Sequence, residues 1–152
     1  MKKWHIGKAT KEHSQILLHH RIEMFRSMGR NDEQLNKIRK SMQSYFESDW
    51  LKDIDAYVAV VEDEIVGGIA VSFFRMMPSA SNATGIIGHI YNLYVEPDFR
   101  NMGIATGLLY RVLQLCGARK AGKITLHATD LGLGIYLKIG FKKRENYYEL
   151  AL

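Results

Sequence analysis

Apolar residues recur along the first third of the chain at the spacing of helices, after a short alternating segment. In residues 2–7, Trp4 and Ile6 alternate with polar positions, which predicts a short strand. Apolar side chains then return every three or four positions over residues 10–28, where Thr10 is the expected N-cap, and again over residues 31–46. The pattern therefore predicts a strand followed by two amphipathic helices.

From residue 56 onward the pattern changes to runs rich in β-branched and aromatic residues. Residues 56–61 and 65–74 are two such runs, and the polar turn Glu62–Glu64 between them is typical of a hairpin. The further elements that the pattern predicts are a strand over 86–95, a helix over 105–118, a strand over 123–128, a helix over 131–139 and a final strand region over 140–152. This order predicts a mixed α/β (α+β) domain built around a central sheet.

Composition narrows the class of protein but not its function. The chain has 152 residues, of which 47% are hydrophobic and 24% charged, so we expect one globular domain over residues 1–152. The single cysteine, Cys116, excludes an internal disulfide and a multi-cysteine zinc site, and we expect no metal. The net charge of +5 favours an anionic ligand or partner without identifying it.

Membranes and nucleic acids are not expected partners. No run approaches the roughly 18 consecutive apolar residues of a membrane span, and the two lysines near the N-terminus precede no apolar segment of a signal peptide. We therefore expect a cytoplasmic protein. The chain also lacks a basic stripe interleaved with exposed aromatic residues, so nucleic-acid binding is not predicted.

The stretch with the clearest chemistry is residues 90–109. Pro97 ends a predicted strand, a compact turn follows, and a helix then begins with its unpaired N–H groups directed at the turn. Such helix starts bind phosphate, and Gly103 would let the backbone approach an anion closely. Neither a Walker loop nor a Gly-x-Gly-x-x-Gly motif is present. Taken alone, the Arg-x-x-Gly-x-Ala pattern fits an ordinary strand-to-helix turn equally well.

This segment resembles the acetyl-CoA-binding signature of the GNAT superfamily of N-acetyltransferases, Gln/Arg-x-x-Gly-x-Gly/Ala, which also follows a strand ending in Val-x-Pro. A second segment, Ile135–Phe141, resembles the family's Leu-Tyr-x-x-x-Gly-Phe, with isoleucine in place of leucine. The element order matches over nearly the whole chain. The resemblance implies the GNAT-like acyl-CoA N-acyltransferase fold, with a central, mostly antiparallel sheet flanked by helices. Thr129 and Gly132 depart from the Asn-x-x-Ala that many members carry.

The resemblance implies direct transfer of an acetyl group from acetyl-CoA to a primary amine, without a covalent enzyme intermediate. Backbone N–H groups of the turn would hold the pyrophosphate, and a strand edge would pair with the pantetheine arm. In the family this strand splays from the next one, here residues 123–128. The cofactor-binding residues implied by the resemblance are Leu93, Val95, Arg100, Asn101, Met102, Gly103, Ile104, Ala105, Thr106 and Thr129.

Two catalytic residues follow from the same resemblance. Tyr136 occupies the tyrosine of the second signature and would protonate the leaving thiolate as general acid; otherwise it is a half-buried aromatic residue of an amphipathic helix. His89 lies eleven positions before Arg100, where several members carry the base, and would accept the amine proton directly or through water. Otherwise it is a core or loop histidine, and Glu96 and His127 are alternative bases. Without a bulge, His89 would share a face with Leu93 and Val95.

The acceptor is not identified by the sequence. We expect it between residues 26–32, which join the first two helices, and residues 76–85, a loop rich in small residues. A small-molecule amine and a protein amine both remain open, and many relatives are dimers, so a homodimer is an expectation by resemblance. The alternative function is a CoA-binding regulatory or interaction module without turnover. Thr129 and Gly132 favour this alternative, whereas Tyr136 opposes it.

Overall fold

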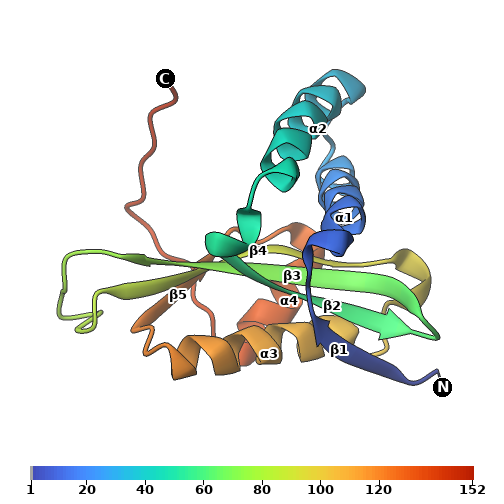
Figure 1. Ribbon diagram of the computed structural model, residues 1–152. Coiled ribbons are helices and arrows are strands. Elements are labelled where there is room, and N and C mark those ends of the chain that lie inside the picture. The colour runs from blue at the N-terminus through green and yellow to red at the C-terminus, as the bar shows by residue number, and fades with distance from the viewer. Residues whose placement is uncertain (1) are drawn as a thin grey trace.

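A five-stranded sheet forms the centre of the computed structural model, which describes residues 2–152 (Figure 1). The strands lie in the order of the chain: β1 (Trp4–Lys8), β2 (Ile54–Val61), β3 (Glu64–Arg75), β4 (Ile86–Val95) and β5 (Lys123–Leu126). Strands β1 to β4 are antiparallel, and β5 runs parallel to β4. The predicted mixed, mostly antiparallel sheet is therefore confirmed.

Helices cover both faces of this sheet (Figure 1). Helices α1 (Ser14–Ser27) and α2 (Asp32–Glu47) lie on one face, and α3 (Ile104–Ala118) and α4 (Asp130–Ile139) lie on the other. Asn31 begins α2 with a capping box, because its side chain accepts the Gln34 N–H while the Gln34 side chain accepts the Asn31 N–H. Short 3-10 turns occur at Lys11–His13, Trp50–Lys52 and Pro97–Phe99. Among residues 2–152, no helix is both long and apolar enough to cross a membrane.

Each face of the sheet has its own hydrophobic core. Beneath α3 and α4 the core includes Leu108, Leu109 and Val112, which are fully buried. Beneath α1 and α2 it includes Ile22 and Trp50. The two cores use opposite sides of the same strands, because successive strand residues point to opposite faces.

Strand β4 contains a bulge that changes which residues share a face. Asn92 has a left-handed backbone conformation with φ 60°, and the pairing of β4 with β3 shifts register there. Tyr91 packs against the α1/α2 core, and the Asn92 side chain donates to the Leu17 carbonyl of α1 at 3.2 Å. Two consecutive residues therefore face the α1/α2 side.

The bulge corrects one prediction from the sequence. His89 lies on the α1/α2 side with Tyr91, since their rings are in contact at 4.6 Å between centroids. Leu93 and Val95 pack against the core under α3. The expectation that all three share a face holds only for a regular strand and is wrong here, because the extra residue at the bulge inverts the alternation.

The C-terminal segment also differs from prediction. Residues 140–152 form no strand, and Tyr147, Tyr148, Leu150 and Leu152 are exposed. Four consecutive charged residues, Lys142–Glu145, interrupt the apolar pattern, so this part of the segment has no apolar face to bury against the sheet. The prediction of a final strand region over 140–152 is therefore wrong, and β5 ends the sheet on this side.

Candidate active site

The turn between β4 and α3 leaves a row of backbone donors without partners. Gly103 precedes α3 with φ 79°, and no side chain caps the helix. Within the described residues, the N–H groups of residues 101–106 make no hydrogen bond, whereas the Gly107 N–H donates to the Gly103 carbonyl at 2.9 Å. These six donors lie at the positive end of the helix dipole. The turn can therefore hold an anion such as a pyrophosphate.

Two side chains fix the shape of this turn. The Arg100 Nε donates to the Val95 carbonyl at 2.9 Å and so ties the turn to the end of β4. From β1, the Trp4 Nε1 donates to the Met102 carbonyl at 3.0 Å. The Trp4 ring occupies the space beside Gly107, where an added Cβ would lie 2.5 Å from the ring. Sequence reasoning missed Trp4 in this role, because its contact with Met102 spans 98 positions.

Strand β4 presents a free backbone edge beside this turn. Strand β5 pairs with β4 only over Ile87–Ile90, so Tyr91–Val95 extend past the end of β5. The strand predicted over 123–128 ends at Leu126, so no strand pairs with this side of β4 beyond Ile90 within the described residues. Leu93 and Val95 belong to this stretch, which pairs with no strand on this side, and an extended, peptide-like ligand can pair here with backbone groups other than the Val95 carbonyl, which accepts from Arg100. The stretch leads directly to the donors of residues 101–106.

Tyr136 belongs to α4 and is buried in the core on the α3/α4 face of the sheet. It is 6% exposed, and its ring packs edge-on against Phe141 with 5.7 Å between centroids. Burial raises the pKa of the Tyr136 phenol above its usual value of 10, so the hydroxyl is protonated at neutral pH and can donate. This protonation state suits a general acid.

The two residues that depart from the family pattern have local roles in α4. The Thr129 side chain caps the helix by accepting the Gly132 N–H at 3.2 Å. An added Cβ at Gly132 would lie 3.1 Å from the Tyr136 ring, which is closer than side chains normally pack. Gly132 thus leaves room for Tyr136 in its present position.

His89 lies on the opposite face, at the end of the β4–β5 pairing. Its Nδ1 is 2.6 Å from the Thr125 Oγ1, and its ring centroid is 5.5 Å from that of His127. Burial, and to a lesser degree His127, lower the pKa of His89 below 6.5. The imidazole is therefore neutral at pH 7 and can accept a proton.

The structure separates the alternative bases. His127 is beside His89, whereas Glu96 follows the other end of β4 and contacts α1 through the His19 Nε2 at 2.9 Å. The Tyr94 hydroxyl also donates to Glu96 at 3.3 Å. Glu96 therefore belongs to a polar cluster at the far end of β4 and not to the surroundings of His89.

The two segments expected to flank the acceptor are not close to each other. The connection between α1 and α2 lies at the outer end of these helices, and the β3–β4 loop lies beyond the ends of the strands that it joins (Figure 1). That loop folds back on itself, since the Met76 N–H donates to the Gly85 carbonyl at 2.7 Å. Between the two segments, the α1/α2 face of the sheet carries polar side chains.

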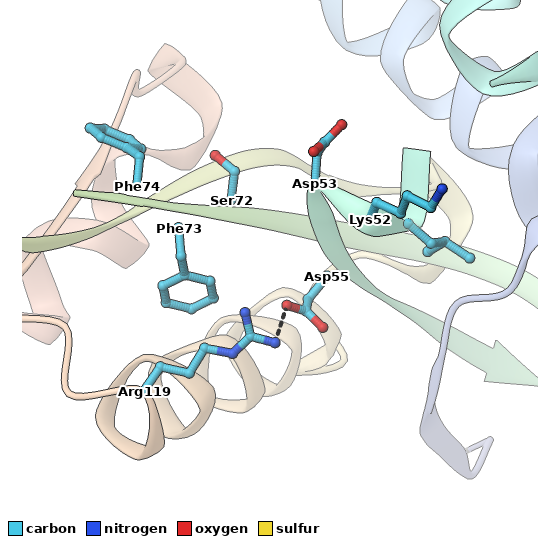
Figure 2. A pocket seen from close by; sticks show the side chains of 8 residues that line it. Lys52, Asp53, Asp55, Ser72, Phe73, Phe74 and Arg119 are labelled. Carbon is cyan, nitrogen blue, oxygen red and sulfur yellow. Dashed lines mark ion pairs between the residues drawn. The ribbon is translucent and has the colours of Figure 1, made fainter. Parts of the chain in front are cut away.

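A pocket of about 360 Å³ opens at one end of β2 and β3 (Figure 2). Ser72, Phe74 and Asp53 extend to one side of the strands, whereas Phe73, Asp55 and Arg119 extend to the other. An ion pair of 2.7 Å joins Arg119 to Asp55. The Ser72 hydroxyl donates to the Tyr91 hydroxyl at 3.1 Å and so connects the pocket to the ring packed on His89.

Comparison with known proteins agrees with this geometry. The model of the acetyltransferase (GNAT) family matches residues 20–141, so the chain belongs to this family of acyltransferases. The chain is 25% identical over 88 residues to glucosamine 6-phosphate N-acetyltransferase of Trypanosoma brucei brucei. That match spans 58% of this chain and 58% of the trypanosomal enzyme, which is less than two thirds of its length.

Solved structures share the fold over almost the full chain. A predicted acetyltransferase of Clostridium acetobutylicum, solved with acetyl-CoA, is 27% identical with a TM-score of 0.81, and the match covers 98% of this chain and 96% of that chain. A GCN5-related N-acetyltransferase of Ralstonia eutropha JMP134 has a TM-score of 0.85 at 22% identity, with 98% and 99% of the two chains covered. The second of these supports the fold alone.

Proposed function

We propose that this protein transfers an acetyl group from acetyl-CoA directly to a primary amine. The observation that carries the proposal is the row of unpartnered N–H groups at residues 101–106, next to the unpaired edge of β4. This arrangement fits a ligand with a pyrophosphate at one end and a peptide-like arm at the other. The clostridial relative solved with acetyl-CoA supports the same ligand.

Different residues would bind different parts of acetyl-CoA. The backbone of Asn101–Thr106 holds the pyrophosphate, and Arg100 contributes by tying the turn to β4 through its side chain. The backbone of Leu93 and Val95 pairs with the pantetheine arm, and an N–H near Val95 stabilises the oxyanion that develops on the acetyl carbonyl. The Thr129 hydroxyl, which accepts one hydrogen bond as N-cap, keeps its own proton for donation to this arm.

Two proton transfers complete the reaction. His89 accepts the proton of the attacking amine, directly or through water, because its neutral imidazole faces the α1/α2 side from which the acceptor approaches. Tyr136 donates its proton to the departing thiolate on the other side of β4. The thiol that forms has an ordinary pKa of about 8.5, so protonation assists its departure near neutral pH.

The test is a turnover assay with acetyl-CoA and a panel of primary amines, including amino acids, amino sugar phosphates, polyamines and peptides with free N-termini. Thiol release that depends on the amine, together with an acetylated product by mass spectrometry, is expected. CoA binding without thiol release for any amine would instead favour the regulatory or interaction module.

The role of His89 has its own test in the pH dependence of kcat/KM. Because the pKa of His89 is lowered, wild-type activity is expected to fall only as the pH drops below 6.5. The His89→Gln variant should be about 10²- to 10⁴-fold slower and should lack this acidic decline. A variant that keeps the wild-type acidic decline would exclude His89 as the base.

A further inference from the structure

Arg21, on the inner side of α1, carries a charge that the protein itself does not neutralise. Its Nε is fully enclosed, yet within residues 2–152 it has no hydrogen-bond partner, and no carboxylate lies within 4 Å of the guanidinium. Two other arginines, in contrast, have carboxylate partners: Arg119 contacts Asp55 at 2.7 Å, and Arg26 contacts Glu23 at 3.3 Å. Enclosed charged groups normally have a counter-ion or a full set of hydrogen bonds.

Aromatic residues hold the guanidinium of Arg21 in place. The Phe25 ring lies beneath it at 4.9 Å from the ring centroid. Burial lowers the pKa of Arg21, and the phenols of Tyr91 and Tyr45 partly offset this effect. Arginine remains charged at neutral pH even so. Asp53 is near enough to raise the pKa of Tyr45 but forms no ion pair with Arg21.

The position of Arg21 places this charge beside the candidate active site. The Leu17 carbonyl, which accepts the Asn92 amide at the β4 bulge, lies one helical turn before Arg21. Tyr91, which is near enough to raise the pKa of Arg21, packs its ring on His89 with 4.6 Å between centroids. Arg21 and the proposed base therefore lie on the same face of the sheet and are connected through Tyr91.

We propose that Arg21 binds an anionic group of the acceptor, so that the preferred substrate is a small amine that also carries a carboxylate or a phosphate. The inference rests on the proposed function and specifies its substrate class. The terminal nitrogens of Arg21 are not enclosed, and a guanidinium binds either anion through paired, charge-assisted hydrogen bonds. Polyamines and other polycations are poor substrates, because they would bring further positive charge to an unneutralised cation.

The experiment compares acceptors that differ only in the anionic group: an amino acid with its amide, and an amino sugar phosphate with the unphosphorylated sugar. Wild-type kcat/KM should be about 10- to 100-fold higher for at least one anionic acceptor than for its neutral counterpart. In Arg21→Gln this preference should disappear while the KM for acetyl-CoA stays unchanged, and Arg21→Lys should recover part of it. The two pairs distinguish a carboxylate from a phosphate.

Arg39→Gln is the matched control, because it removes an exposed arginine of α2 that lies outside the segments expected to flank the acceptor. It should retain the wild-type preference. An equal preference in wild type and Arg21→Gln, or faster turnover of neutral amines and polyamines by the wild type, would overturn the proposal.

A binding measurement separates this proposal from the proposed function. Calorimetric titration of CoA-saturated protein should detect N-acetylglycine or an N-acetylated amino sugar phosphate with wild type and Arg39→Gln. The affinity should be at least tenfold weaker in Arg21→Gln. This result would support the anion site even if no amine in the panel were acetylated. Equal binding by wild type and Arg21→Gln would contradict the proposal, and so would the absence of binding of either anion by the wild type.

Discussion

The two faces of the sheet contribute to the site in different ways. On the α3/α4 face, the groups to which we assign cofactor binding are backbone N–H groups, and the side chains around them form an apolar core that includes Leu108 and Leu109. On the α1/α2 face, the groups to which we assign functions are polar side chains such as His89 and Arg21. The helices there leave one end of the sheet uncovered (Figure 1). A ligand common to a whole family can be bound by a backbone geometry, whereas a particular acceptor requires particular side chains.

The first test of this difference removes the one side chain on the α3/α4 face to which we assign a proton transfer. Tyr136→Phe keeps the packing against Phe141 and removes only the hydroxyl. We expect kcat to fall by about 10²- to 10⁴-fold in steady-state assays, with little change in CoA affinity.

Tyr147→Phe is the matched control for that substitution, because Tyr147 is an exposed tyrosine of the C-terminal segment. It should leave kcat unchanged. If Tyr136→Phe turned over at the wild-type rate, the α3/α4 face would contribute binding alone, and the general acid would have to be sought elsewhere.

A second prediction concerns stability. Leu108, a residue of α3, is fully buried against the sheet, whereas Phe74 is 43% exposed at the uncovered end of the other face. Leu108→Ala should lower the free energy of unfolding by about 2–5 kcal/mol, because it leaves a cavity in a packed core. Phe74→Ala should cost less than about 1 kcal/mol. Urea unfolding measures both, and equal losses would show that the two faces are packed alike.

The difference between the faces also explains what could be predicted from the sequence. The turn between β4 and α3 is a local feature in which Pro97 follows a strand and Gly103 precedes a helix, so the pattern of a few residues predicted the position of the turn. Its role in binding pyrophosphate was inferred from the family resemblance. The bulge at Asn92 depends on pairing with β3, and the contact of Trp4 with Met102 depends on the complete sheet. The unpaired charge of Arg21 becomes visible only when every neighbour is known. Features made by long-range packing carry no local signal.

The pH dependence of stability tests the core of the α1/α2 face. Burial, with a smaller effect of His19, lowers the pKa of His20 from 6.5 to about 4. Glu96 is 3.6 Å away, but its carboxylate hydrogen-bonds to His19, so we expect burial to dominate. The unfolded chain takes up a proton below pH 6.5 and the folded protein does not, so stability is complete above pH 6.5 and decreases toward pH 4.

Wild type should therefore lose about 2 kcal/mol of unfolding free energy through this group between pH 7.5 and pH 5. Urea unfolding at the two pH values measures the loss. His20→Gln has no imidazole to titrate and should lack this part of the decrease, although it is less stable at pH 7.5. Parallel pH profiles for the two proteins would show that His20 is not held neutral.

The smallest expected effect compares two tryptophans that make the same kind of hydrogen bond on opposite faces. The Trp4 Nε1 donates to the Met102 carbonyl at 3.0 Å under α3, and the Trp50 Nε1 donates to the Ser14 hydroxyl at 3.0 Å under α1. Trp4→Phe removes the hydrogen bond to Met102 and so loosens the turn between β4 and α3. We expect the KM for acetyl-CoA to rise about two- to tenfold with kcat nearly unchanged, since a neutral hydrogen bond contributes about 0.5–1.5 kcal/mol.

Trp50→Phe is the control for Trp4→Phe, because it removes an equivalent bond far from the turn in the chain. It should lower the free energy of unfolding without raising the KM for acetyl-CoA. If both variants raised this KM equally, general loosening of the fold would explain the effect. A selective rise in Trp4→Phe would instead show that β1 positions the backbone donors of the α3/α4 face, and that this face binds its ligand through a geometry supported from the far edge of the sheet.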